Sequence, residues 1–364
     1  MKTEFLSAVI NLLNVKGLGP HRVRSLVTTF PNAESIFDLS VKTLCSAEGI
    51  DIKSARTVKN YSHFDHAEQI AAKAEKLDVN IVSFWDENYP ILLKKIYDPP
   101  VLLYCKGKQL KLKSDCVSVV GTRKASAYGK SAARHLSEDL CGVGMTIVSG
   151  LARGIDSIAH KSAIQCGGKT IAVLGSGVDV IYPPENKSLY KAILENGTVI
   201  SEFPLGTKPD AGNFPQRNRI ISGLSHGTLV VEAGNKSGAI LTALNAVDQG
   251  REVFAVPARI TDKTSAGCLR LIRNGAIPAE SAKRILEHIH SRLFQPRKHR
   301  QEKMNLNLKN DERSLYDILS HKPLHIDVIA KESGKTGTET LSILLSLELK
   351  GAAVQLSGKQ FVRA

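Results

Sequence analysis

Between residues 108 and 290, short apolar runs alternate with longer segments whose apolar residues recur at helical spacing. Short runs rich in β-branched side chains, without polar alternation, are typical of strands buried on both faces. The pattern predicts strands at 116–120, 145–149, 170–174, 198–201, 228–232 and 252–256, and helices at 127–141 and 155–165. It indicates an α/β domain with a parallel sheet and helices on both faces.

Residues 1–75 have the pattern of short helices. Residues 15–20 (VKGLGP) precede an amphipathic stretch at 21–30, the order of a helix–hairpin–helix, whose glycine turn lets backbone amides approach a DNA phosphate. Residues 48–52 are a degenerate second copy, in which Asp51 would repel phosphate. A helical packing module without DNA contact explains the pattern equally well.

Residues 81–107 contain Pro90, Pro99 and Pro100, which favour an extended backbone. Three aromatic residues are expected to anchor this segment against the sheet domain. They are Trp85, Tyr89 and Tyr97.

Residues 292–312 lack apolar periodicity and carry clustered charge, which predicts a solvated linker. Helices at 314–319, 326–332 and 338–349 and a hairpin at 354–362 then follow in the order of a winged helix. The third helix, TETLSILLSLEL, contains two glutamates and no arginine. This composition favours a protein contact or a structural role at least as much as binding in a DNA groove. The expected parts are residues 1–75, 76–290, 291–311 and 312–364.

The charge balance favours a polyanionic partner, nucleic acid above all: 49 Lys and Arg face 35 acids, a net charge of +14. No apolar run is long enough to predict a membrane span, and residues 1–17 lack a signal-peptide pattern. The six cysteines form no C-x-x-C pair. We therefore expect no metal site, no disulfide framework and a reducing cytoplasm.

Glycine-rich turns follow the predicted strands. They are residues 121–123 (GTR), 150–156 (GLARGID), 175–177 (GSG) and 233–238 (AGNKSG). Ligands of open parallel sheets bind at the carboxyl ends of the strands, where these turns must gather. Together with Arg123, Arg153 and Lys236 they predict an anion-binding rim. Strand-to-helix geometry alone would explain any single turn.

Residues 210–225 (DAGNFPQRNRIISGLS) predict a helix that starts near Phe214, with Asn213 as its cap. Arg217 and Arg219 would then oppose the helix dipole, a cost that a bound phosphate would relieve. Phe214 could stack a nucleobase at the same place. A core Phe214 with solvated arginines fits this stretch equally well.

Enzyme motifs are incomplete. Residues 175–180 lack the third glycine of the dinucleotide fingerprint, and residues 168–170 (GKT) lead into a strand rather than a helix. We therefore expect no catalytic residue and no cofactor, and we expect Asp156 to cap the helix near Ile155 or to hold Arg153. The enzymatic alternative is a nucleotide phosphoribohydrolase of the lysine-decarboxylase-like (LOG) type. Its P-G-G-x-G-T-x-x-E motif is broken here, because Glu232 lies one residue too far.

The chain closely resembles DNA-processing protein A, the DprA/Smf family. The most specific stretches are residues 149–156 (SGLARGID) and 214–222 (FPQRNRIIS), supported by 119–123 (VVGTR) and 230–233 (VVEA). The resemblance implies a Rossmann-like core with an N-terminal SAM- or helix–hairpin–helix-like domain and a C-terminal winged helix. It implies a non-enzymatic cytoplasmic protein of natural transformation that binds and protects single-stranded DNA. It also implies loading of RecA recombinase and a homodimer formed through the sheet domain.

The resemblance further implies DNA contacts along the rim. They are Gly121, Thr122, Arg123, Ser149, Arg153, Phe214, Arg217, Asn218, Arg219, Ser237 and Gly238, to which the glycine turns add Gly150, Gly154 and Lys236. Arg123, Arg217 and Arg219 are expected to neutralise phosphates while the protein stays folded after their charge reversal. Arg153 and Asn218 could instead brace the pocket. An adaptor with a vestigial pocket is a third alternative.

Overall fold

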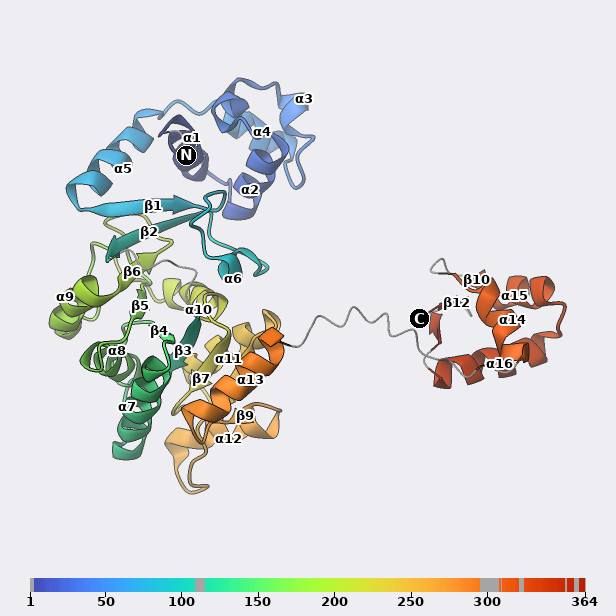
Figure 1. Cartoon of the computed structure of the whole chain (residues 1–364). Helices are drawn as coiled ribbons and strands as arrows, with labels where there is room; N and C mark the ends of the chain where they lie inside the picture. The colour runs from blue at the N-terminus through green and yellow to red at the C-terminus, as the bar shows by residue number, and fades with distance from the viewer. Residues whose placement is uncertain are drawn as a thin grey trace. The chain divides into compact units, whose positions relative to one another are not determined.

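The computed structural model describes residues 3–108, 115–294, 308, 310–320, 324–350, 352–356 and 360–363. Contacts divide the chain into two compact units, residues 1–293 and 294–364 (Figure 1). Most of the predicted linker and the tip of the predicted hairpin, residues 357–359, lie outside the described residues.

The first unit begins with helices that share an apolar core with Val101 and Leu102. Their bounds are α1 Thr3–Asn14, α2 Pro20–Thr29, the 3-10 helix η1 Ala33–Asp38, α3 Val41–Leu44, α4 Ile52–Lys59 and α5 Asp65–Lys76. The two predicted hairpins join α1 to α2 and α3 to α4, and Gly17 and Gly49 take positive φ in them, at 81° and 74°. Asp51 caps α4 by accepting a 2.7 Å hydrogen bond from the Ser54 amide. Its carboxylate therefore stabilises this helix start.

A nine-stranded sheet forms the centre of the first unit. Its strands are β1 Val79–Ser83, β2 Leu102–Gly107, β3 Cys116–Val120, β4 Thr146–Ser149, β5 Thr170–Val173, β6 Thr198–Ser201, β7 Gly227–Val230, β8 Glu252–Ala255 and β9 Ile277–Pro278. The order across the sheet is β1-β2-β6-β5-β4-β3-β7-β8-β9. The run from β6 to β9 is parallel. The six predicted strands are confirmed to within two residues.

The interpretation of residues 81–107 as an extended bridge is wrong in part. They contribute to β1 and β2, which pair antiparallel, and β2 pairs antiparallel with β6. The short helix α6 Ile91–Lys94 lies between them. Tyr89 is a buried anchor whose hydroxyl donates to the Pro100 carbonyl at 2.7 Å, but Tyr97 is 95% exposed and anchors nothing. Trp85 packs edge-on to Phe5 at 5.7 Å, so it faces the N-terminal helices.

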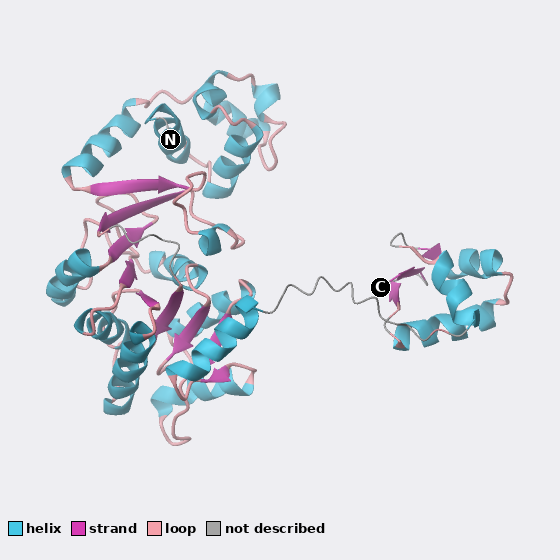
Figure 2. Cartoon of the chain, in the orientation of Figure 1, coloured by secondary structure: helices cyan, strands magenta, loops and turns pink. Residues whose placement is uncertain are grey.

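Helices cover both faces of the sheet, as predicted (Figure 2). One face packs against α7 Ala127–Gly142, α8 Ile155–Gln165 and α13 Ala282–Phe294. The other packs against α10 Asn213–Gly223, α11 Gly238–Asp248 and α12 Ala266–Arg273. Successive residues of one strand supply both cores, as Ile147 and Val148 do, because side chains alternate along a strand. The remaining elements are α9 Lys187–Asn196 and the 3-10 turns η2 Pro184–Asn186 and η3 Lys263–Ser265.

The second unit is a small winged helix, also as predicted. It consists of α14 Asn310–Ile318, β10 Leu324–His325, α15 Ile326–Ser333, α16 Gly337–Leu349, β11 Ala353–Leu356 and β12 Gln360–Arg363. Leu315, Ile329, Leu344 and Phe361 form its core. Thr336 and Glu339 start α16 with a reciprocal capping box. Leu341 and Leu345 are exposed on the same helix, in keeping with its apolar sequence.

Candidate functional site

A cavity of about 930 Å³ opens at the carboxyl ends of β3 and β7. The chain order across the sheet reverses between these two strands, since β4, β5 and β6 lie on one side of β3 and β8 lies beyond β7. Crevices at such reversal points are the usual ligand sites of open α/β sheets. The cavity is lined by Val120, Gly121, Thr122, Arg123, Ala152, Asp156, Tyr182, Pro209, Asp210, Ala211, Phe214, Pro215, Arg217, Asn218, Ile221, Gly234, Lys236, Ser237, Gly238, Ala239, Leu241, Thr242 and Thr264.

Two backbone loops are locked together beside this cavity. The Thr122 amide donates to the Glu232 carbonyl at 2.7 Å, and the Ile155 amide donates to the Thr122 carbonyl at 3.2 Å. Gly154 takes a φ of 76°, and a Cβ at this position would lie 2.3 Å from the Thr122 carbonyl oxygen. Glycine is therefore required at residue 154 for the loop after β4 to approach the loop after β3.

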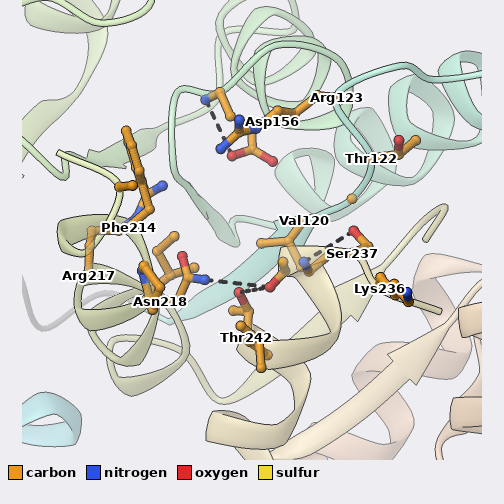
Figure 3. A pocket seen from close by; sticks show the side chains of 18 of the residues that line it. Val120, Thr122, Arg123, Asp156, Phe214, Arg217, Asn218, Lys236, Ser237 and Thr242 are labelled. Atoms are coloured by element: carbon orange, nitrogen blue, oxygen red, sulfur yellow. Dashed lines mark hydrogen bonds between the residues drawn. The ribbon is translucent and has the colours of Figure 1, made fainter. Parts of the chain in front are cut away.

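Phe214 stands at the mouth of the cavity, partly exposed (Figure 3). Its ring rests on the backbone of Gly175, where a Cβ would lie 3.0 Å from the ring. The Arg123 guanidinium carbon lies 5.7 Å from the ring centroid, and the Tyr182 ring centroid lies at the same distance. An aromatic face beside an exposed cation can accept a base and its phosphate together.

Three exposed cations surround the opening. Arg123 and Lys236 line the cavity, while Arg153 lines a small adjoining recess. Arg153 forms an ion pair with Glu185, which holds the Arg153 pKa above and the Glu185 pKa below their ordinary values. Because both side chains are exposed, this ion pair contributes little to stability, and another anion can replace Glu185 as the partner of Arg153.

Arg217 requires a correction, because it does not project into solvent. The residue is only 4% exposed, and its Nη1 donates to the backbone carbonyls of Gly150, at 2.8 Å, and Val173. A Cβ at Gly150 would lie 2.3 Å from this nitrogen. Burial lowers the pKa of Arg217 to about 10, an effect that the nearby Asp156 charge opposes. Arg217 thus braces the floor beneath Phe214, a role that the sequence suggested only for Arg153 and Asn218.

Asp156 and Asn213 also differ from expectation. Asp156 accepts hydrogen bonds from the amides of Gly150 and Ala152, at 3.1 and 3.4 Å, and does not hold Arg153 or cap α8, whose N-cap is Gly154. Burial raises its pKa, against the opposing charge of Arg217. Asn213 lies inside the first turn of α10, and its side chain donates to the Gly175 carbonyl at 3.1 Å. The helix begins with no side-chain cap.

Arg219 and Ser149 are not brought to the cavity. The Arg219 Nη2 bonds Glu202 at 2.5 Å and lies 3.5 Å from Asp98, on a different face of α10 from Arg217. Two carboxylates thus neutralise it away from the cavity, so this arrangement does not support the expected phosphate role. Ser149 is fully buried, and its hydroxyl donates to the Val119 carbonyl at 2.6 Å.

The remaining predicted residues gather at the start of α11. Ser237 caps this helix by accepting from the Ala239 amide at 3.3 Å, and Gly238 follows as its first residue. Asn218 is buried and its side-chain amide points at the Gly238 carbonyl, 3.5 Å away. Gly121, Thr122, Lys236, Ser237 and Gly238 therefore share one cavity with Phe214 and Arg123. A helix start with nearby cations favours anionic ligands.

Sequence reasoning missed Tyr182, Leu241, Thr242 and Thr264 as lining residues. Tyr182 lies in the same connection between β5 and η2 as the GSG turn, but it is neither a glycine nor a cation, the two signals that indicated the rim. Leu241 and Thr242 lie within the first two turns of α11, where their positions follow from the predicted helix start at the AGNKSG turn.

Glu232, on which the phosphoribohydrolase alternative depends, is 1% exposed and faces α7. Its Oε2 accepts from the Ser126 amide and hydroxyl, at 2.9 and 3.1 Å. Among the described side chains, no three His, Cys, Asp or Glu residues lie together as a metal site. Within the described ranges, no helix combines the length and apolarity needed to cross a bilayer.

His160 lies in the core below Arg217 and is expected to make folding sensitive to acid. Thr170 donates its hydroxyl proton to Ile147, so the His160 Nδ1, 2.6 Å from that hydroxyl, must donate to it. Burial, with a smaller effect of Arg217, lowers the pKa of this ring from 6.5 to about 3, so the ring is neutral at pH 7. Below pH 6.5 the imidazole of His160 is protonated in the unfolded chain but not in the folded protein. The free energy of unfolding therefore falls as the pH falls from 6.5 towards 3.

Between pH 7 and pH 5 this group should remove about 2 kcal/mol of unfolding free energy. Urea unfolding at both pH values, followed by circular dichroism, would measure the loss. In His160→Leu this part of the pH dependence should vanish while the contribution of Asp156 remains. An identical pH dependence in both proteins would contradict the assignment.

Comparison with known proteins agrees with this architecture. Residues 80–290 match the family model described as DNA recombination-mediator protein A. Residues 302–359 match the DprA winged helix domain, and residues 9–60 match a SAM-like helix-hairpin-helix tandem. The chain is 39% identical over 273 residues to the DNA processing protein DprA of Bacillus subtilis, which covers 74% of this chain and 92% of that protein.

Two solved structures are similar over much of the chain. DNA processing protein A from Streptococcus pneumoniae superposes with a TM-score of 0.67 at 35% identity, over 79% of this chain and 98% of that one. A structure describing the single-stranded DNA binding mode of DNA processing protein A from Helicobacter pylori gives a TM-score of 0.53 at 30% identity, over 60% and 96% of the two chains. With its sheet domain matched from residue 80 to 290, this chain belongs to the DNA recombination-mediator protein A family, also called DprA/Smf.

Proposed function

We propose that this chain binds single-stranded DNA in the cavity between β3 and β7. The observation that carries the proposal is the grouping of Phe214, Arg123 and Lys236 with the start of α11 around one opening. An aromatic platform beside cations suits a strand whose bases are free to stack, and it places few demands on sequence. The affinity of the Helicobacter pylori relative for single-stranded DNA supports the same ligand.

The proposed contacts divide into two groups. Arg123, Lys236 and, after release from Glu185, Arg153 meet phosphates, while Phe214 stacks one base. Thr122, Ser237 and Gly238 line the path, and Arg217, Asn218, Gly150 and Gly154 support it from beneath. The formal net charge of +14 favours encounter with the strand.

The proposal extends to the steps after DNA binding. Loading of RecA recombinase onto the bound strand, protection of that strand, and a homodimer formed through the sheet domain are consistent with family membership. No catalytic step is proposed, in keeping with a Glu232 that is buried against α7. Two cavities in a dimer would bind one strand with added avidity.

Phe214→Ala should weaken binding of a fluorescein-labelled oligothymidine by roughly 5- to 150-fold, the effect of losing one stacked base. Fluorescence anisotropy would measure it. For the wild type, the logarithm of affinity should fall with the logarithm of salt concentration with a slope of about −2, since about three phosphates are neutralised.

Tyr97→Ala is a matched control, because Tyr97 is an aromatic side chain with 95% exposure outside the cavity lining. It should bind like the wild type. Wild-type protein that bound no oligothymidine at low salt would refute the proposed function, and unchanged binding by Phe214→Ala would refute this site.

A further inference from the structure

Tyr182 and Phe214 are two rings that meet at the cavity mouth from distant parts of the chain. Tyr182 comes from the connection after β5 and Phe214 from the first turn of α10. Their centroids lie 5.7 Å apart with the planes inclined at 38°. Tyr182 is 39% exposed, and both residues line the main cavity. More than a third of the Tyr182 surface is therefore open beside the ligand cavity.

Each ring has a guanidinium beside it. Arg123 lies 5.7 Å from the Phe214 centroid. Tyr182 and Arg153 border a small recess, which Arg123 and Phe214 also line. The recess therefore joins two units of the same kind, each with one ring and one cation. Each nucleotide of a strand carries one base and one phosphate, so two ring-and-cation pairs side by side match two successive nucleotides.

We propose that Tyr182 is a second base-stacking residue, so that neighbouring nucleotides of one strand rest on Phe214 and Tyr182. This inference rests on the proposed function. Arg123 and Arg153 then take the phosphates of the two nucleotides. A single base cannot enter between the rings, because that would need a separation of about twice the 3.4 Å base-stacking spacing, and the centroids are 5.7 Å apart. The two rings thus serve two different bases.

Glu185 fits this arrangement as the anion that Arg153 holds when no strand is bound. The two side chains are 60% and 49% exposed, so their ion pair is weak and readily replaced. A phosphate offers the Arg153 guanidinium stronger, two-pronged hydrogen bonds. Tyr182 lies next to this exchange, so binding of its base and release of Glu185 occur together.

Anisotropy with an oligothymidine would test the inference through Tyr182→Ala and Tyr182→Phe. The alanine variant should bind roughly 5- to 150-fold more weakly, whereas the phenylalanine variant keeps the ring and should bind like the wild type. An oligonucleotide with abasic sites distinguishes base stacking from a purely structural role of Tyr182. Since no base is present to stack, the wild type and Tyr182→Ala should bind it alike. Tyr97→Ala again serves as the control.

The outcomes separate this inference from the proposed function. Weak binding by Phe214→Ala with full binding by Tyr182→Ala would overturn the second subsite and leave the first intact. An equal loss by Tyr182→Ala on normal and abasic strands would overturn stacking in favour of a structural role. If the alanine variant does not fold, irradiation of the wild type with a 5-iododeoxyuridine strand decides: a cross-link to Tyr182 is expected, and its absence alongside a cross-link to Phe214 would refute the proposal.

Discussion

Arg123→Glu should weaken binding of oligothymidine by about 30-fold or more. The change removes a charge-assisted contact of about 2 kcal/mol and places a repelling carboxylate at the same rim. Arg123 is exposed, lines both the cavity and the recess, and lies over Phe214. Its replacement therefore affects the phosphate and the stacked base together. Anisotropy over a salt series would measure the loss, with a shallower salt dependence in the variant.

Arg134→Glu is the matched control, because it makes the same change of charge at an exposed arginine of α7 outside the cavity lining. It should reduce affinity only through net charge, by a small factor that salt removes. Both variants should unfold at the wild-type urea concentration. Equal losses from the two substitutions would mean that binding depends on overall charge and not on this rim.

Arg217→Leu should lower the free energy of unfolding by roughly 3–5 kcal/mol, the effect of removing one partner from a buried charged network. The substitution leaves the carbonyls of Gly150 and Val173 without their donor and Asp156 without its compensating charge. Urea unfolding followed by circular dichroism would measure it. Binding of DNA should weaken too, because Phe214 rests against this arginine at 6.0 Å.

A double mutant separates the ionic part of this effect from the packing part. Asp156→Asn keeps an acceptor for the Gly150 amide but removes the buried charge, so adding it to Arg217→Leu should cost less than the two separate losses combined. Simple additivity would show that Arg217 and Asp156 do not interact. A stable Arg217→Leu protein that merely failed to bind DNA would restore the phosphate role expected from the sequence.

The sequence predicted the sheet and the edge at which the cavity opens, because both depend on local signals. Runs such as CVSVV have strand periodicity, and glycine turns mark where each strand ends. The direction in which each arginine of α10 points was not predictable. Arg217 and Arg219 are two residues apart, which places them on different faces of a helix, and long-range partners decide which face is buried. These partners are Val173 for Arg217 and Glu202 for Arg219, and both lie outside α10.

Tyr182 and the antiparallel edge were missed for a similar reason. Tyr182 follows the GSG turn of residues 175–177, but the rim was predicted from glycines and cations alone, and its neighbour Phe214 is 32 residues away along the sequence. The segment between β1 and β2 contains three prolines, so the sequence did not indicate that these strands pair. Their register is fixed by contacts with β6 and with the N-terminal helices, which sequence periodicity does not report.

The shared core of the N-terminal helices and strand β2 limits how the chain could be shortened. Val101 and Leu102 are buried together with Val9, Leu12 and other side chains of those helices. A fragment begun at residue 76 would present this apolar surface to water and invite aggregation. Fragments made for crystallisation or labelling should therefore retain the N-terminal helices and be cut after the sheet domain instead.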